Sequence, residues 1–451
     1  QHLQRQAHRP SGDFRPEQLL MGVRMPSTTT RLAAAGIAAL TGAAAFAAAP
    51  AQAAGAEIHV STKGSDSAAG TAAAPLRTVQ AAIDRATPGT TIKVHAGTYS
   101  QVLNIKNSGT ASARIVVTNA GDGAVTLTSA QAPDSCSNRR PSSRRTIKIM
   151  TGADYWTFQG LNIVHGAYLS GKGSGKAYSW HAGLVKKGLW EPRRQVPGTG
   201  SRNPTAARGA AAYLAKVTGT AMDPVEGISF IGNTMTGRGI YASLSNSGVV
   251  KDNVIKDIIC GTGPGVWAMN HSNFWQVSGN DISRIKPAVG AHFMHEGIRF
   301  GSAANYNTIT NNYVHDLEGD GRAFNTDVDG SWNTFSNNRA ANVAIGYNDQ
   351  MSGWGNTWTN NTVTRYRTYA FAFRMKDGSL RLPSKHSSTN GAIVSGNVAS
   401  SPAGGRGLGI GGSMNSKFTG NTFPNVFLGK YLKTYWGKYG NTWNGSTRPP
   451  V

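Results

Sequence analysis

Short blocks of alternating apolar and polar residues recur through the second half of the chain, and each ends in Gly-Asn, Asp-Asn or Asn-Asn. Successive blocks lie 20 to 36 residues apart, which corresponds to one short coil plus insertions of varying length. A period of this kind is typical of a solenoid. The pattern predicts an all-β fold, a single-stranded right-handed parallel β-helix over residues 54–451. The final asparagines of the eight blocks are Asn233, Asn253, Asn280, Asn312, Asn338, Asn361, Asn397 and Asn421.

An asparagine at the same corner of every coil predicts a ladder of side-chain amides along the solenoid axis. Because Asn tolerates left-handed backbone dihedrals, we expect the ladder residues to adopt them. A flat β-sandwich is the alternative. A sandwich would need many Asn-Gly hairpin turns between closely spaced strands. Such turns are not the commonest turn signal in this sequence, and this favours the β-helix.

Two segments depart from the repeat. Residues Thr78 to Ala86 have helical periodicity and precede Pro88-Gly89, which predicts an amphipathic helix that caps the open N-terminal end of the solenoid. Residues 166–219 are rich in Lys, Arg and aromatic side chains and predict a loop insertion that binds a sugar-acid chain, with a solvated loop as the alternative. The expected substrate-binding residues of this insertion are Lys186, Lys187, Trp190, Arg193 and Arg194.

The N-terminal region predicts export. Arg24 and Arg31 precede an alanine-rich apolar run, which ends in Ala51-Gln52-Ala53, and this order is typical of a secretory signal over residues 21–53. A membrane anchor is the alternative, but the run is only weakly hydrophobic. Residues 1–20 are polar and read as upstream sequence. We therefore expect an extracellular protein, with no membrane association.

The formal net charge is +23, which favours a polyanionic partner. Export favours an acidic polysaccharide over nucleic acid, and we expect no nucleic-acid partner. We expect a monomer. Cys136 and Cys260 could form a disulfide in an oxidising compartment, or Cys260 could be a buried thiol.

Alternation of apolar residues predicts which strand positions face outward. With Ile298 and Phe300 inward, His295 and Arg299 face outward. The same reading of later strands places these residues inward: Phe324, Thr326, Val328, Val343, Ile345, Tyr347, Phe371, Phe373 and Met375. A register error of one residue would invert this assignment. The predicted outward residues of the later strands are Asn325, Asp327, Asp329, Asn348, Arg374 and Lys376.

The entry segment resembles that of parallel β-helix polysaccharide lyases, in the run from VSTKGSDSAAGT through PLRTVQAA to PGTTIKVHAGTY. Further on, GDGRAFN, WNTFSNNRAANVAIGYND and AFRMKDG are similar in order to the calcium and base segment of family 9 pectate lyases. In that family an Asp of a D-G pair, a D-D-G-x-D cluster and a Lys form the site. Asp320 matches the first Asp, but the cluster here reads AIGYN, and Arg374 stands where the Lys would be, with Lys376 two residues on.

The resemblance implies β-elimination on a uronic-acid polymer such as pectate, alginate or glucuronan. Arg299 is the expected partner of the sugar carboxylate, and Lys376 or Arg374 lies near the base position, provided that neighbouring cations depress the pKa of the lysine. Tyr347 and His295 are further proton donors. Asn325 and Asn348 are expected to contact substrate. Ca²⁺ is conceivable at Asp320, Asp327 and Asp329, although the missing acids of the cluster argue against it.

Two other functions stay open. Asn325-Thr326-Asp327 is similar to the N-T-D motif of polygalacturonase-type β-helix hydrolases, which use paired carboxylates, but the following D-D pair and the G-H-G motif are missing. A non-catalytic β-helix that binds acidic polysaccharide is the third possibility.

Overall fold

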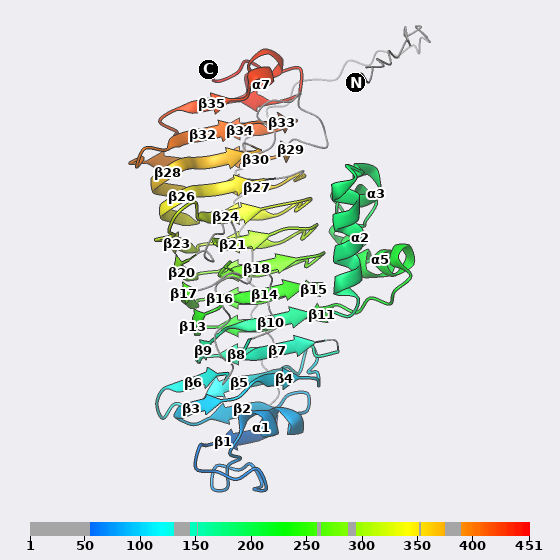
Figure 1. Ribbon diagram of the computed structural model, residues 1–451, viewed down its shortest axis with the longest axis vertical. Coiled ribbons are helices and arrows are strands. Elements are labelled where there is room, and N and C mark those ends of the chain that lie inside the picture. Colours follow the sequence, from blue (N-terminus) through cyan, green and yellow to red (C-terminus); the bar gives the residue numbers. More distant parts are fainter. Residues whose placement is uncertain are drawn as a thin grey trace, which may run out of the picture. The chain divides into compact units, whose positions relative to one another are not determined.

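The computed structural model describes residues 55–129, 145–150, 152–258, 263–286, 295–350, 353–374 and 389–451. The predicted signal, Cys136, Cys260 and Lys376 lie outside these residues. The described residues form a stack of parallel coils, and the predicted right-handed parallel β-helix is confirmed (Figure 1).

Each complete coil contributes three strands in a fixed order. The first strand belongs to a 13-stranded sheet: β1 (Glu57–Val60), β2 (Thr91–Val94), β5 (Ile115–Asn119), β8 (Trp156–Gln159), β12 (Ser229–Ile231), β16 (Val249–Lys251), β19 (Gln276–Ser278), β22 (Thr308–Thr310), β25 (Thr334–Ser336), β27 (Thr357–Thr359), β30 (Ile393–Ser395), β34 (Lys417–Thr419) and β36 (Thr442–Trp443).

The other two strands of each coil belong to a 19-stranded sheet that bends into two columns. The first column contains β3 (Gly97–Ser100), β6 (Val125–Thr128), β9 (Asn162–Val164), β13 (Thr234–Gly237), β17 (Val254–Ile258), β20 (Asp281–Ile285), β23 (Tyr313–His315), the first halves of β26 (Arg339–Asp349) and β28 (Thr362–Phe373), and β31 (Val398–Ser400).

The second column contains β4 (Leu103–Ile105), β7 (Ile147–Met150), β10 (Ala167–Ser170), β14 (Ile240–Ser243), β18 (Val266–Met269), β21 (Glu296–Phe300), β24 (Arg322–Thr326), the second halves of β26 and β28, β32 (Arg406–Ile410) and β35 (Val426–Leu428). Two short pairs, β11 (Val225–Glu226) with β15 (Ser245–Asn246) and β29 (Thr389–Asn390) with β33 (Ser413–Met414), extend the turns after this column.

The predicted asparagine ladder is confirmed at all eight positions. In each pair the side-chain oxygen of one Asn accepts from the backbone and the side-chain amide of the Asn one coil before, for example Asn338 Oδ1 from Asn312 N and Nδ2, both at 3.0 Å. The ladder residues lie between the 13-stranded sheet and the first column, and those of the inner coils are buried. Their amides therefore satisfy one another where water is excluded.

The expected left-handed dihedrals occur one residue earlier. The residue before each ladder Asn has positive φ, as in Asp252 (54°), Asn311 (57°) and Asn337 (55°), or is a glycine such as Gly232 (61°). The ladder asparagines themselves are not among the positive-φ residues. The preceding residue turns the chain, and this leaves the next side chain free to point along the axis.

Helices close both ends of the described stack. The predicted N-terminal cap is confirmed as α1 (Val79–Arg85), whose Thr78 side chain accepts from Ala81 N at 3.2 Å and whose Val79 and Ile83 are buried. At the other end α7 (Lys430–Tyr435) buries Leu432. No helix among the described residues is long and apolar enough to span a membrane.

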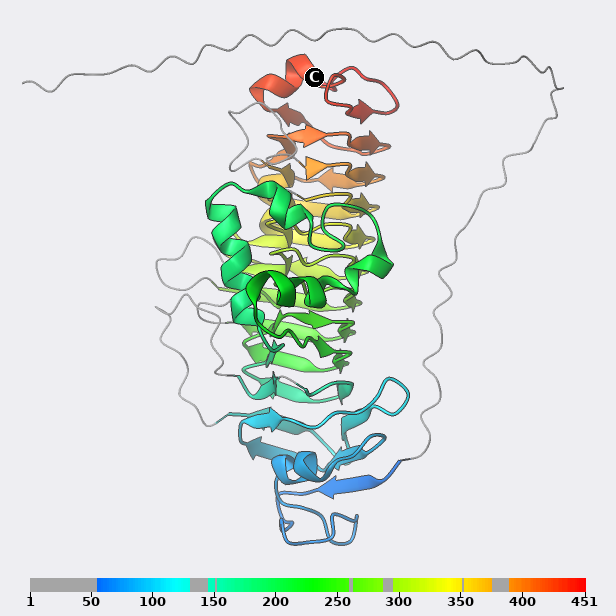
Figure 2. The same cartoon turned by 90° about the vertical axis from the view of Figure 1, so that its right-hand side faces the viewer.

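The expected loop insertion is largely helical. It contains α2 (Ser174–Lys186), α3 (Trp190–Arg194), α4 (Pro204–Ala207) and α5 (Ala210–Thr218), which lie beside the coils and in front of them in the view of Figure 2. Ala177, Val196, Ala210, Leu214 and Leu244 form a small apolar core between the insertion and the β-helix. This core explains why the segment folds, although its sequence lacks the strand repeat.

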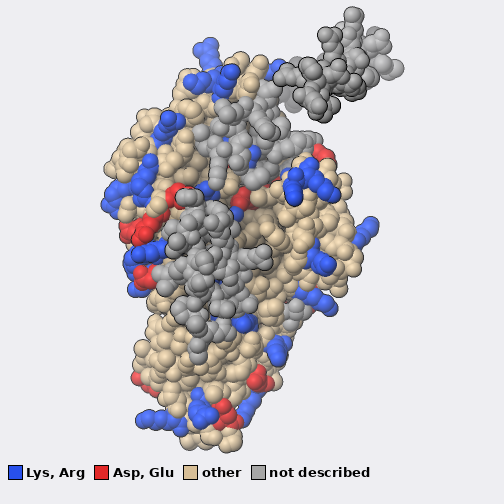
Figure 3. Space-filling view, viewed as in Figure 1, with Lys and Arg blue, Asp and Glu red and all other residues tan. Residues whose placement is uncertain are grey.

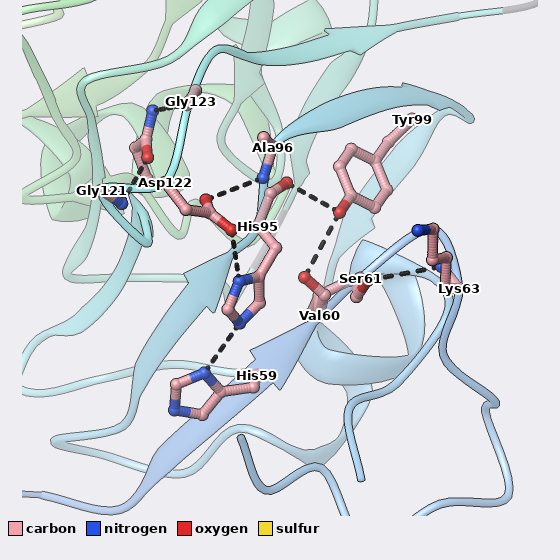
Figure 4. A network of polar contacts seen from close by, with 11 residues as sticks. His59, Val60, Ser61, Lys63, His95, Ala96, Tyr99, Gly121, Asp122 and Gly123 are labelled. Atoms are coloured by element: carbon pink, nitrogen blue, oxygen red, sulfur yellow. Dashed lines mark hydrogen bonds and ion pairs between the residues drawn. The ribbon is translucent and has the colours of Figure 1, made fainter. Parts of the chain in front are cut away.

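A polar network joins the first coils on their outer surface (Figure 4). His59 Nδ1 lies 3.1 Å from His95 Nε2, and His95 Nδ1 lies 2.7 Å from Asp122 Oδ2. The backbone amide of Ala96 donates to Asp122 Oδ1 at 2.9 Å. The network connects β1, β2 and the turn after β5, and its side chains are partly exposed.

Candidate functional site

The outer face of the second column carries a continuous row of outward side chains. In register these are Tyr168, Tyr241, Trp267, Arg299, Asn325, Asn348, Ala372, Gly409 and Phe427. The predicted inward positions Ile298, Phe300, Phe324, Phe371 and Phe373 are buried in the core, as the alternation requires. Val328, also predicted inward, is only partly buried, because it lies in the turn after β24. The predicted row thus lies on the second strand after each ladder corner, not on the first.

A depression with a volume of about 240 Å³ opens on this face at β24, β26 and β28. Its lining residues are Asp320, Arg322, Ala344, Ile345, Asn348, Gln350, Thr368, Tyr369 and Ala372. Asp320 and Arg322 are the charged side chains among them. Of the predicted site residues, the depression brings together Asp320 and Asn348.

Arg322 was missed by the alternation argument, which would place it inward with Phe324. The second column begins at a bend, and at this bend each coil places a small residue toward the core, such as Ala323 or Gly346. There is no room for a larger side chain there, because even a Cβ on Gly346 would lie 2.8 Å from Val363 Cγ2. The residue before this small position therefore turns outward, as Arg322, Ile345 and Tyr369 do in register. Only 9% of Arg322 is exposed, and its Nη1 donates to Gln350 Oε1 at 2.5 Å.

The same bend explains why Ile345 faces the depression, although it was predicted to face inward. Ile345 is half-buried and lines the depression, whereas Val343 and Tyr347 are buried in the core as predicted. The pairing of β26 with β28 shifts register between Val343 and Ile345. The corner therefore interrupts the strict alternation on which the prediction relied.

Arg299 is not available as a carboxylate partner for substrate. Its guanidinium donates to Glu296 Oε1 at 2.9 Å and to Asp327, and it lies over the ring of Trp267 at 5.6 Å. Both acids are themselves buried. The expected role of Arg299 does not hold, because protein carboxylates already neutralise it.

The three carboxylates expected to bind Ca²⁺ each contact a different part of the protein. Asp327 binds Arg299, Asp320 lies 2.7 Å from His295 Nε2, and Asp329 contacts the insertion. Within the described residues, no group of three His, Cys, Asp or Glu side chains is placed to hold a metal ion. These residues do not fit a shared calcium site.

Asp329 fixes the helical insertion to the β-helix. Its Oδ2 lies 2.8 Å from His181 Nε2 of α2 and 2.9 Å from Arg193 Nε of α3, and its side chain is completely buried. His271 stacks edge-on against His181 at 5.9 Å, and burial together with His181 lowers the pKa of His271 to about 3. Arg193 is therefore a buried structural partner of Asp329.

The other predicted residues of the insertion differ in position. Lys186 and Lys187 are exposed at the end of α2. Arg194 lies 4.9 Å over the ring of Trp354 and 3.8 Å from Glu191. Trp190 begins α3, and its side chain lies outside the described part.

Tyr347 and His295 are not surface proton donors. Tyr347 is stacked in the core between Phe324 and Phe371, and its hydroxyl donates to Asn338 O at 2.8 Å; burial raises its pKa well above the ordinary value. His295 is 2% exposed and lies behind Asp320. It can orient Asp320 but does not itself line the depression.

Asn325 and Asn348 form a pair on the floor of this face, where Asn348 Nδ2 donates to Asn325 Oδ1 at 2.7 Å. Arg374 follows β28 with φ of 56°, and its guanidinium donates to the carbonyl of Gln350. This bond and the bond from Arg322 fix Gln350 from two coils. Lys376, the expected base, lies outside the described residues.

Asp349 is a buried acid that the sequence analysis did not select. It points inward, in register with Thr326 and Phe373, and its Oδ2 accepts from Asn356 Nδ2 at 3.2 Å. Burial raises the pKa of Asp349 to about 7. Its inward parity with Tyr347 is the signal that could have identified it.

Fold and geometry together define a parallel β-helix protein with a small depression whose lining includes a guanidinium. Positive side chains outnumber negative ones on the face seen in Figure 3. Residues 58–179 match the family model described as "Pel9A-like, right handed beta helix region". The predicted resemblance of the entry segment to β-helix polysaccharide lyases of the family 9 pectate lyase kind is thereby confirmed over these residues.

Pectate lyase PEL9 of Emericella nidulans is 39% identical over 118 residues, which are 25% of this chain and 29% of that protein. The match thus spans less than a third of the length of this curated relative. Among solved structures, pectate lyase Pel9A is 13% identical, with 83% of this chain and 79% of that chain covered and a TM-score of 0.44. The GH136 lacto-N-biosidase from Eubacterium ramulus is 13% identical, with 82% and 67% covered and a TM-score of 0.47.

Proposed function

We propose that this chain is a secreted polysaccharide lyase that cleaves a uronic-acid-containing polysaccharide by β-elimination. The observation that carries the proposal is Arg322, a guanidinium that lines a depression on the outer face of the second column. The 39% identity over 118 residues with a pectate lyase and the net charge of +23 support an acidic polysaccharide as substrate. The predicted signal supports secretion.

The chemistry starts at the sugar carboxylate. A guanidinium presents planar donors that match a carboxylate, and neutralising the carboxylate acidifies the proton on the adjacent C5. Because Arg322 is held by Gln350, and Gln350 in turn by Arg374, its orientation is set before substrate arrives. Such preorganised charge stabilises the enolate-like transition state without reorganisation.

A base must then remove the C5 proton, and the bond to the 4-linked oxygen breaks to give an unsaturated sugar. Lys376 is the base expected from the sequence. Asp320 is a second candidate, because it lines the depression and its carboxylate is held by His295 at 2.7 Å. Comparing Lys376→Ala with Asp320→Asn separates the two assignments, since only loss of the base abolishes turnover while binding is kept.

The hydrolase alternative needs two carboxylates that flank the scissile bond. In the described part of the depression, Asp320 is the single carboxylate, and the Asp327 of the N-T-D motif is paired with Arg299. This arrangement favours the lyase.

The test is to incubate the purified protein with pectate, alginate, glucuronan and glycosaminoglycans, with and without a chelator. We expect ultraviolet absorbance from the unsaturated product on one of them, and its persistence with chelator, since the three carboxylates do not form a shared calcium site. New reducing ends without absorbance would replace the lyase by a hydrolase. Neither signal, together with measurable binding, would leave a binding protein.

A further inference from the structure

Arg406 and Phe427 form an exposed cation–aromatic pair on the same face as the depression. The guanidinium of Arg406 lies 4.5 Å over the ring of Phe427. Arg406 is exposed, and 38% of Phe427 is exposed. Both residues belong to the last coils of the second column, in β32 and β35.

The strand register connects this pair to the depression. Arg406 is in register with Tyr369, and Tyr369 with Ile345 and Arg322, so Arg322 and Arg406 occupy the same column position three coils apart. At the spacing of parallel strands, three coils correspond to about 14 Å. In the neighbouring row, Ala372 and Gly409 lie between Asn348 and Phe427, so no bulky side chain of that row separates the two places.

Arg406 differs from the other arginines of this face in its partners. Arg299 is bound by two acids and Arg322 by Gln350, whereas in the described part of the chain no acidic side chain pairs with Arg406. Stacking on a ring leaves the N–H edge of a guanidinium open to a carboxylate. The exposed part of Phe427 offers an apolar surface to the C–H groups of a sugar.

We propose that Arg406 and Phe427 form a second binding site for a uronate residue, on the same polysaccharide chain that occupies the depression. The carboxylate meets the guanidinium and the pyranose packs against the ring. The inference rests on the proposed function, and it adds a minimum substrate length: a chain must span about 14 Å to engage both arginines.

The test measures affinity and turnover over a length series of oligouronates. We expect Arg406→Ala to weaken binding of oligosaccharides that span both places by about tenfold, the effect of losing a charge-assisted hydrogen bond. Phe427→Ala should also weaken their binding, because it removes the ring against which the pyranose packs and over which the guanidinium of Arg406 lies. Binding of di- and trisaccharides should not change. Arg406→Lys should fall between the wild type and the alanine variant, because it keeps the charge without the planar fork.

Arg339 provides a matched control, since its guanidinium is also exposed and lies 4.5 Å over an aromatic ring, that of Tyr313, but in the first column. Arg339→Ala should leave every affinity unchanged. Equal weakening by Arg339→Ala, or equal loss for short and long oligosaccharides, would overturn the second site. If unsaturated product forms while Arg406→Ala and Phe427→Ala bind and turn over every oligosaccharide like the wild type, the proposed lyase activity is supported and the second binding site is contradicted. If the two substitutions weaken binding of long oligosaccharides only, but no unsaturated product forms, the second binding site is supported and the proposed lyase activity is contradicted.

Discussion

The first coils and the coils around the depression share one backbone design but hold their charged groups differently. In the first coils, His59, His95 and Asp122 form a partly exposed network, and the hydrogen bond from His95 lowers the pKa of Asp122 (Figure 4). Around the depression, Arg299, Asp327 and Asp329 are buried and paired. Exposed pairs contribute little to stability, whereas breaking a buried pair leaves an uncompensated charge.

The similarity to known proteins falls on the first of these regions. The family match ends at residue 179, whereas the depression is lined by residues 320–372. The sequence similarity to known proteins therefore concerns the scaffold of the first coils, whereas the residues of the depression belong to the later coils. Four predictions test this contrast, beginning with the largest expected effect.

Asp329→Asn should destabilise the protein by about 3–5 kcal/mol, because it removes the charge that holds His181 and Arg193 in a buried site. Denaturant unfolding measures the loss, and limited proteolysis should show cleavage within residues 174–218. The matched control is Asp122→Asn in the first coils, for which we expect a far smaller change. Equal effects of the two substitutions would contradict the contrast between buried and exposed pairs.

Arg322→Ala should lower kcat/KM on the active polyuronate by about 100-fold, the cost of losing a preorganised charge at the reacting group. Arg322→Lys should recover part of the activity, since it restores charge without bidentate geometry. The readout is the rate of ultraviolet absorbance increase. An Arg299→Lys variant that lost more activity than Arg322→Lys at equal stability would return the role to Arg299.

Asn338→Ala should cost about 2 kcal/mol, because Asn338 donates to Ile309 O and Asn361 Oδ1 and accepts from Asn312 in a buried ladder. Asn104, an exposed asparagine in the first coils, is the control, and Asn104→Ala should be close to neutral. The change in unfolding midpoint in urea measures both. A neutral Asn338→Ala would mean that the ladder is dispensable once the coils are packed.

The pH dependence of stability should carry two opposite contributions. The pKa of Asp349 is about 7 in the folded protein, above its ordinary value near 4, so the stability it contributes falls as pH rises through this window. The pKa of His271 is about 3, below its ordinary value near 6.5, so stability falls as pH drops through that window.

Thermal midpoints between pH 3 and pH 8 separate the two groups. Asp349→Asn should remove the decline toward neutral pH, and His271→Gln should remove the decline on the acid side. Each variant should change the thermal midpoint by a few degrees on its own side of the pH profile and leave the midpoints on the other side unchanged. Profiles parallel to that of the wild type in both variants would exclude these two groups as the source.

Much of the scaffold could be predicted because its signals are local and repeated. Every ladder position and the inward facing of Ile298, Phe324 and Phe371 follow from alternation and from a corner residue that recurs once per coil. The capping helix follows from helical periodicity in a single local segment. Because the alternation and the corner asparagine recur in every coil, insertions of different length do not obscure the pattern.

The site could be predicted only in part, because charges find their partners across coils. Asp320 and Asn348 line the depression as expected, but Arg322 was missed since the corner at Ala323 reverses the parity of the strand. Arg299 was assigned to substrate, although its partners are Glu296, three residues earlier, and Asp327, which lies 28 residues on and is reached only across a coil. Sequence order does not say which of two neighbouring charges is already neutralised.

The sequence by itself determined the coil, the ladder, the cap and the facing of the strands away from the corner of the second column. These features depend on local periods: two residues along a strand, one coil for the ladder and a helical turn for the cap. Only the tertiary structure decided that His181 meets Asp329, 148 residues away, and that Gln350 lies between Arg322 and Arg374. The physical reason is that a buried charge must be paired within a few ångströms, and the stacking of coils brings together residues that no local pattern connects.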